Sequence, residues 1–269
     1  MNSPSIVSCN GATLYYEEYG EGRPIVFLHG AWAGLRFFES QLKSLSDEYR
    51  TVALDFRGHG RSEKTEAGHT VPQYARDVES VFDHLNLDDV VLVGWSLGAN
   101  VSWEYVDQFG TGRLRALVDI DMEPAPVQWE EDEHGTYDLE RVRDIHVGIQ
   151  TDHLGFSDQV IDRVLKDPPS EAVRTMMFDE MSRCPPSVKS AIIMDATMRE
   201  YRDVLPEIDV PTLVCAGADE KWRSVAAVEE AAELILDARF ELFEESGHDI
   251  TIEEPERFNR VLRGFVSSL

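Results

Sequence analysis

Lysine is scarce in this chain of 269 residues, and acidic residues greatly outnumber basic ones. There are 51 Asp and Glu against 25 Lys and Arg, which gives a formal net charge of -26. A surface of this charge repels phosphate backbones and anionic lipid headgroups. We therefore expect neither nucleic acid nor a membrane surface as a partner. The lysines are Lys43, Lys64, Lys166, Lys189 and Lys221.

Long apolar runs and cysteines are also few. No stretch approaches the roughly 20 apolar residues that span a bilayer, and the first twenty residues contain neither a basic leader nor an apolar signal core. Cys9, Cys184 and Cys215 are too widely spaced to suggest a disulfide framework or a metal cluster. We expect a cytoplasmic protein with reduced cysteines and no metal site.

Strand and helix patterns alternate along most of the chain. Buried or half-buried strands are expected at 12–20, 23–30, 49–58, 88–93, 113–122, 210–219 and 238–246. Helical patterns are expected at 71–87, 97–109, 224–235 and 255–267. Such alternation indicates an α/β fold with a mostly parallel sheet wrapped on both faces.

The alternation stops between residues 123 and 205, where four helical patterns follow one another with no strand between them. We expect this segment to be a helical cap inserted into a core formed by 1–122 and 206–269. Its many methionines suit an adaptable apolar cavity, although they also suit simple packing of the cap on the core. They are Met176, Met177, Met181, Met194 and Met198.

The stretch "VVLVGWSLGANVSWEY", residues 90–105, places Ser96 between Gly94 and Gly98 where a strand gives way to a helix. GxSxG alone is a weak signal, but strand, tight turn and helix together are the setting of a nucleophile elbow. Ser96 is therefore the candidate nucleophile. The alternative is an ordinary helix-capping serine.

Five motifs in order carry a resemblance to the α/β-hydrolases over essentially the whole chain: "FLHGAWAG" (27–34), "DFRGHGRS" (55–62), "GWSLG" (94–98), "AGADE" (216–220) and "SGHDITIEEPERF" (246–258). The resemblance implies an eight-stranded, mostly parallel sheet with a helical cap, Ser96 as nucleophile, His248 as base and no cofactor. Among family members, the chain is similar to esterases, lactonases and cofactor-free haloperoxidases or perhydrolases.

The acid that orients the histidine has three candidates. Asp219 is preferred, because it follows the penultimate strand, the family's usual place for this residue. The usual spacing after the glycine would instead point at Glu220. Asp121 ends the strand after the seryl helix, where some family members carry the acid, and it ranks second, ahead of Glu220.

Acyl transfer also needs donors for the oxyanion of the tetrahedral intermediate. The backbone N–H of Leu97, at the start of the helix, is one candidate, and Ala31 resembles the family's second donor. Trp32 and Trp95 flank these two residues. They are expected either to form walls of the substrate pocket or simply to pack.

The sequence thus predicts a serine hydrolase that cleaves small apolar carboxylic esters or lactones through an acyl-enzyme. A peroxide-dependent activity on the same acyl-enzyme is the alternative within the enzyme class. A non-catalytic ligand-binding protein on the same fold is the alternative outside it.

The charge excess predicts adaptation to salt. Self-repulsion opposes folding at low salt and is screened in about 1 M KCl, where the Debye length is about 3 Å. We expect the melting temperature, measured by circular dichroism, to rise as KCl is raised from millimolar to molar concentration. A fall in the melting temperature over this range would contradict salt adaptation and indicate an ordinary acidic enzyme.

Overall fold

The computed structural model describes residues 5–127 and 135–269, and within them the chain forms one eight-stranded sheet. The strand order is β1-β2-β4-β3-β5-β6-β7-β8. Strand β2 pairs antiparallel with both β1 and β4, and the other five pairings are parallel. This confirms the expected α/β-hydrolase sheet. The strands are β1 (Ser5–Cys9), β2 (Ala12–Tyr19), β3 (Pro24–Leu28), β4 (Arg50–Leu54), β5 (Val90–Trp95), β6 (Leu114–Ile120), β7 (Thr212–Gly217) and β8 (Ala238–Phe243).

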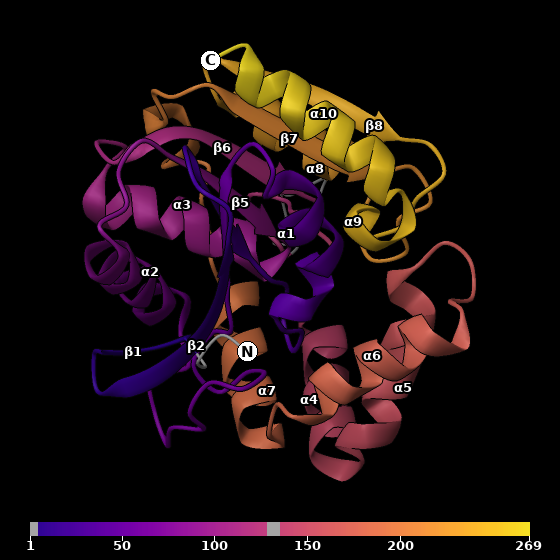
Figure 1. Cartoon of the computed structure of the whole chain (residues 1–269). Helices are drawn as coiled ribbons and strands as arrows, with labels where there is room; N and C mark the ends of the chain where they lie inside the picture. Colours follow the sequence, from indigo (N-terminus) through magenta and orange to yellow (C-terminus); the bar gives the residue numbers. More distant parts are fainter. Residues whose placement is uncertain (1–4, 128–134) are drawn as a thin grey trace.

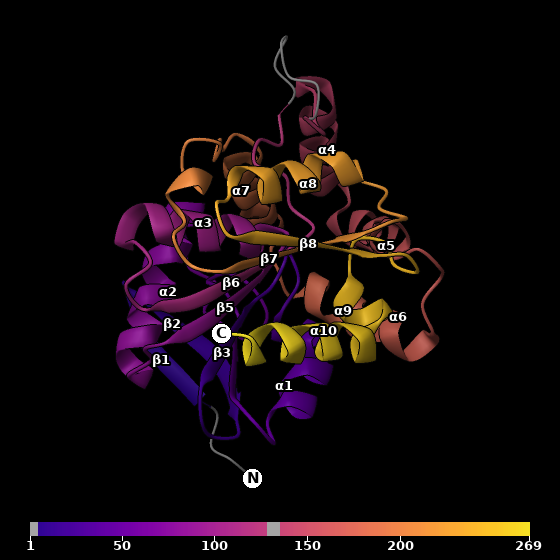
Figure 2. The same ribbon diagram turned by 90° about the horizontal axis from the view of Figure 1, so that it is seen from above.

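Helices cover both faces of the sheet (Figures 1 and 2). Helices α1 and α10 pack together on one face, and α2, α3 and α8 lie on the other. The helices are α1 (Glu39–Leu45), α2 (Val71–Leu85), α3 (Leu97–Phe109), α4 (Leu139–Thr151), α5 (His153–Val164), α6 (Glu171–Ser182), α7 (Pro186–Thr197), α8 (Val225–Leu234), α9 (Ile250–Glu253) and α10 (Pro255–Ser267), with short 3-10 turns at Leu35–Phe38 and Leu205–Glu207.

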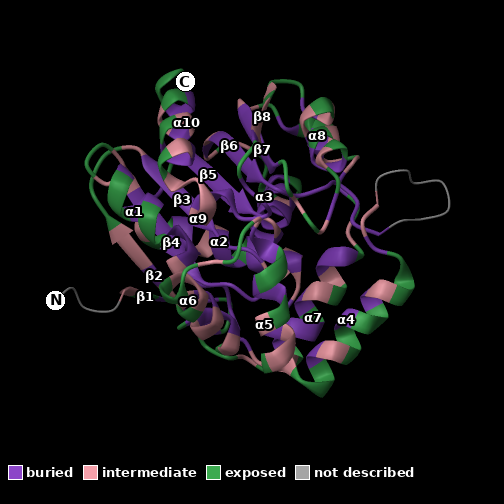
Figure 3. Ribbon diagram, turned by 90° about the vertical axis from the view of Figure 1, so that its right-hand side faces the viewer, coloured by how far each residue is buried: buried purple, intermediate pink, exposed green. Residues whose placement is uncertain are grey.

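The central strands are buried along their whole length. Every residue of β3 and of β5 is buried, because parallel strands covered by helices on both faces need apolar side chains at every position. Figure 3 shows this buried sheet with the outer faces of the helices exposed. None of the described helices is long and apolar enough to cross a membrane.

Strand β1 is the element that the hydrophobic pattern did not indicate. It pairs with β2 through a two-residue hairpin whose loop residues, Asn10 and Gly11, have φ of 47° and 76°. Both positive angles are those of a type I′ turn, for which Asn-Gly is the preferred sequence. The hairpin lies at the edge of the sheet, far along the strand order from β5.

Helices α4 to α7 lie between β6 and β7 in the chain and gather at one end of the sheet (Figure 1). They coincide with the segment for which a cap is expected, apart from residues 128–134, which lie outside the described residues. Arg36 ties this helical group to the core by ion pairs to Asp179 at 3.0 Å and Glu180 at 3.2 Å. At a second point, the backbone N–H of Val71 donates to Asp195 at 2.8 Å.

Candidate active site

Ser96 stands at the seam between β5 and α3 with φ 53° and ψ -115°. Positive φ is costly for a residue with a side chain and persists only where its surroundings enforce it. The two glycines explain how the turn fits. A Cβ at Gly98 would lie 2.1 Å from the Leu28 carbonyl oxygen, and one at Gly94 would lie 2.5 Å from the Ala99 nitrogen.

His248 lies in the loop between β8 and α9, and two hydrogen bonds fix its backbone. Its N–H donates to the Val164 carbonyl at 2.8 Å, and its own carbonyl accepts from the Trp95 indole at 2.8 Å. The residue beside Ser96 therefore holds the histidine loop directly. Ser96 and His248 line the same cavity, so the structure brings these two predicted residues together.

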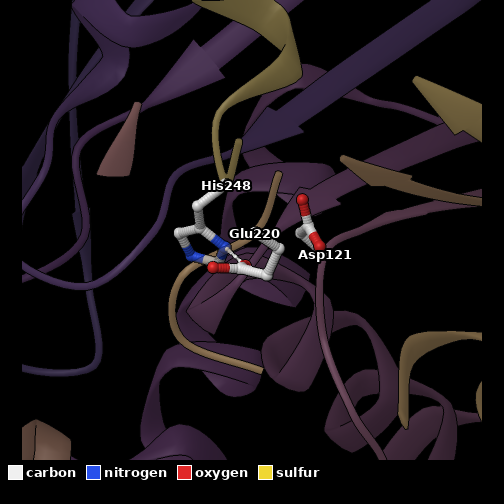
Figure 4. A group of neighbouring side chains, drawn as sticks. All are labelled: Asp121, Glu220 and His248. Atoms are coloured by element: carbon white, nitrogen blue, oxygen red, sulfur yellow. Dashed lines mark hydrogen bonds and ion pairs between the residues drawn. The ribbon is translucent and has the colours of Figure 1, made fainter. Parts of the chain in front are cut away.

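Glu220 is the carboxylate that His248 contacts. The Nδ1–H of His248 donates to Glu220 Oε2 at 2.5 Å, as the dashed line in Figure 4 marks. The other carboxylate oxygen accepts from the backbone N–H of Trp222 at 2.6 Å. Only 1 % of the Glu220 side chain is exposed. A carboxylate held in this way fixes the tautomer in which Nε2 can accept a proton.

The sequence-based preference for Asp219 is corrected by this geometry. Its side chain is 49 % exposed and forms an ion pair with Lys166 at 2.8 Å. Asp219 follows β7, and its backbone N–H donates to the Ser246 carbonyl at 3.0 Å. At that point of the turn its side chain is directed to solvent, whereas Glu220 one residue later reaches His248.

Asp121, the second choice, lies close by but bonds elsewhere. It is fully buried, and its Oδ2 accepts from the Gly217 backbone at 3.1 Å. A ligand atom from each of Asp121, Glu220 and His248 lies within 4.8 Å of the others (Figure 4). A metal ion fits poorly here, because Nδ1 already bonds Glu220 and the positive charge of Arg223 acts on the same carboxylate.

Burial and charge set the protonation of this group. Burial lowers the pKa of His248 below its usual 6.5, while Glu220 opposes that shift. Burial alone would raise the pKa of Glu220, but the charge and hydrogen bond of His248, together with Arg223, lower it. Burial raises the pKa of Asp121 well above its usual range, and the charge of Glu220 adds to this. Burial therefore favours the neutral forms of His248 and Asp121, whereas His248 and Arg223 favour the ionised form of Glu220.

Of the two candidate oxyanion donors, Ala31 lines the cavity and Leu97 directly follows Ser96, which also lines it. Leu97 is the first residue of α3, so its N–H has no carbonyl one turn earlier to bond, and the helix dipole adds positive potential there. Ala31 lies just after β3 and lines the cavity with Ser96. Ala31 and Leu97 follow β3 and β5, two strands that pair directly.

The cavity around Ser96 has a volume of about 60 Å³ and a mainly apolar wall. Both predicted tryptophans line it, and each also bonds elsewhere: the Trp32 indole donates to the Lys189 carbonyl of α7 at 3.2 Å. Of the five methionines noted in the sequence, only Met181 is among the lining residues, while Met194 and Met198 are 44 % and 43 % exposed. The lining residues are Ala31, Trp32, Trp95, Ser96, Tyr137, Ile145, Val160, Val164, Met181, Ile193, Trp222, Arg223 and His248.

Two residues of this wall were not singled out as site residues from the sequence. Arg223 is buried and pairs with Glu123, and its guanidinium donates to the Asp121 carbonyl. Trp222 stands beside it in the chain. No motif marks either residue; only their position directly after Glu220 could have indicated them.

Comparison with known proteins agrees with this arrangement. A family model described as "Alpha/beta hydrolase family" matches residues 25–261. A non-heme chloroperoxidase of Kitasatospora aureofaciens is 30% identical, over 98% of this chain and 99% of that protein. A non-heme haloperoxidase of Rhodococcus erythropolis is also 30% identical, over 98% and 100%. The solved structure of an esterase from Exiguobacterium antarcticum has a TM-score of 0.94 at 25% identity and covers 98% of this chain and 100% of that one.

The crowding at Gly98 leads to a prediction about stability. Gly98→Ala pushes a methyl group against the Leu28 carbonyl and should lower the free energy of unfolding by about 1–3 kcal/mol. Gly264→Ala on α10 is the matched control, since nothing lies within 4 Å of its added Cβ, and it should raise the free energy by about 0.5–1 kcal/mol. Urea denaturation at constant KCl measures both. Equal stability of Gly98→Ala and the parent chain would contradict this.

A second prediction concerns the partner of His248. Glu220→Gln should lower kcat/KM for an activated ester by about a hundredfold or more, because the histidine loses its orienting charge. Neutral His248 is the active form, so activity rises as pH rises through its pKa, which lies below 6.5. Glu220 raises that pKa, so the acid limb of the glutamine variant should move to still lower pH.

Two control variants separate the three carboxylates. Asp219→Asn should keep activity within about threefold, because the residue pairs only with Lys166. Asp121→Asn replaces a carboxyl whose pKa is raised by burial with a neutral amide, which can still accept from the Gly217 N–H, and should also keep most of the activity. A large loss in either control, with Glu220→Gln unaffected, would reverse the assignment.

Proposed function

Because this chain belongs to the alpha/beta hydrolase family and is an enzyme, we propose that it is a serine hydrolase that cleaves carboxylic esters or lactones through an acyl-enzyme. The observation that carries the proposal is the shared cavity: Ser96 on its crowded turn and His248 bonded to a buried Glu220 border the same space. These are the parts that acyl transfer requires.

In the proposed reaction, the Ser96 hydroxyl attacks the substrate carbonyl while His248 Nε2 takes its proton. Glu220 stabilises the imidazolium that forms, since it is ionised and bonded to Nδ1. The negative oxygen of the tetrahedral intermediate accepts from the backbone N–H groups of Leu97 and Ala31. Removing one such donor costs about 3–4 kcal/mol of barrier in hydrolases of this kind.

Collapse of the intermediate expels the alcohol, which takes the proton from His248. Water then attacks the acyl-serine, with His248 again as general base, and the acid is released. No cofactor enters this sequence of steps. The mainly apolar wall of the cavity supports a small apolar substrate as the partner.

A peroxide-dependent activity is the second candidate, favoured by the names of the two relatives at 30% identity. Hydrogen peroxide would replace water, attack the acyl-serine carbonyl and leave as a peracid, while the serine oxygen regains its proton. The two activities share the acyl-enzyme. Titration of peracid against carboxylic acid, formed with and without peroxide, distinguishes them.

We also propose that this enzyme is salt-adapted and works in the cytoplasm without nucleic-acid or membrane partners. Support comes from the excess of 51 acidic over 25 basic residues, whose mutual repulsion concentrated salt would screen.

The acyl-enzyme proposal is tested by covalent labelling. A fluorophosphonate probe should attach to Ser96 in concentrated KCl, located by mass spectrometry of peptides, and Ser96→Ala should abolish both labelling and turnover of p-nitrophenyl acetate. Absence of labelling in the folded parent chain would instead favour a non-catalytic ligand-binding protein.

A further inference from the structure

A second chamber lies behind the cavity that contains Ser96 and His248. It has a volume of about 340 Å³, against about 60 Å³ for the inner one, and lies along helices α4 and α5. The two chambers share three lining residues, Ile145, Val160 and Trp222. Trp222 has the largest side chain of the three.

The indole is held in place from the side of the outer chamber. The guanidinium of Arg163 lies 4.5 Å from the ring centre, and that of Arg141 lies 5.8 Å from it. Arg141 also stacks at 5.0 Å on Tyr137, which lines the inner chamber. Cation–π contacts of this kind contribute about 0.5–2 kcal/mol each, which favours one orientation of the ring.

The backbone of Trp222 is fixed independently of its ring. Its N–H donates to Glu220 at 2.6 Å, so the turn that carries the wall is the turn that orients His248. Replacing the side chain leaves this N–H in place. The wall can therefore be removed without deleting a bond of the proposed catalytic group.

The volume of the inner chamber limits what it can accept. A water needs about 10–15 Å³ on this scale, so about 60 Å³ holds roughly four waters, or a short acyl chain. The outer chamber has room for several further methylene groups or an aromatic ring, and Trp222 borders both it and the cavity that contains Ser96. Its walls combine apolar residues such as Phe156 and Ile145 with the aliphatic stems of Arg141 and Arg163.

We propose that Trp222 is a specificity-determining partition that restricts the enzyme to esters with short acyl groups, and that removing its indole joins the two chambers and admits long ones. This inference rests on the proposed ester hydrolysis. It assigns the substrate class as short-chain acyl esters.

The test compares acyl chain lengths with one constant leaving group. Values of kcat/KM for p-nitrophenyl acetate, butyrate and octanoate are measured for the parent chain and Trp222→Ala. The parent should prefer acetate or butyrate. In Trp222→Ala the octanoate-to-acetate ratio should rise at least about tenfold, because buried methylene groups then contribute to binding of the transition state.

Three further variants make the comparison specific. Val160→Ala opens the same wall by less and should shift the ratio in the same direction by less. Gln159→Ala enlarges only the outer chamber and should leave the ratio within about twofold. Trp222→Phe keeps an aromatic ring at this position, so its octanoate-to-acetate ratio should stay close to that of the parent chain. If Trp222→Ala fails to fold by circular dichroism, the Val160→Ala ratio decides.

Three outcomes would overturn the proposal that Trp222 is a partition. The first is an unchanged octanoate-to-acetate ratio in both Trp222→Ala and Val160→Ala. The second is a shift of this ratio in Gln159→Ala equal to that in Trp222→Ala, and the third is a parent chain that already prefers octanoate. These results leave ester hydrolysis itself intact. If the parent hydrolyses none of the esters although it folds, then the proposed function fails and the partition fails with it.

Discussion

The left-handed backbone of Ser96 is the constraint on which the rest of the site depends. It occurs where β5 runs directly into α3, and the tight turn requires glycine at position 98, because a Cβ there would lie 2.1 Å from the Leu28 carbonyl oxygen. The same turn raises the serine above the sheet, exposes the first amide of α3 and places Trp95 against the histidine loop. The proposed nucleophile, the proposed oxyanion donor and the loop of the proposed base thus all adjoin one local conformation.

Charge compensation is the second requirement, because the acidic groups behind His248 are almost completely enclosed. Glu220 is stabilised as an anion by His248, the Trp222 N–H and the charge of Arg223. Glu123 is paired with Arg223, whereas burial and the charge of Glu220 raise the pKa of Asp121 more than Arg223 lowers it. Burying one ionised and one neutral carboxyl side by side costs less free energy than burying two anions, because two negative charges repel each other strongly at low dielectric.

The fold was largely predictable because each central element is indicated by the hydrophobic pattern of a whole segment and not by a single residue. Runs such as 24–28 and 90–95 are apolar throughout, and their short length and β-branched residues favour central strands. Strand β1 was missed, since its residues alternate weakly, although the Asn10-Gly11 pair that turns it is itself a hairpin signal. Ser96 and His248 were found by motif and order, and they line the same cavity.

Only the local geometry shows which carboxylate contacts His248 and which residues surround it. Asp219 and Glu220 are neighbours of similar chemistry, and only the direction of the turn after β7 determines which reaches the imidazole. Trp222 gains its importance from Arg141 of α4 and Arg163 of α5, which lie far away in the chain. Arg223 gains its importance from Glu123 and Asp121, which follow β6. Residues of this kind carry no signature within their own segment.

The hydrogen bond from the Trp95 indole to the His248 carbonyl joins residues separated by 153 positions. A nascent chain on the ribosome completes β5 and the serine turn long before the histidine has been synthesised. Under the proposed mechanism, the serine of that unfinished protein has no base beside it. Activity would then require the last loop to dock on the tryptophan, and would not grow gradually with the sheet.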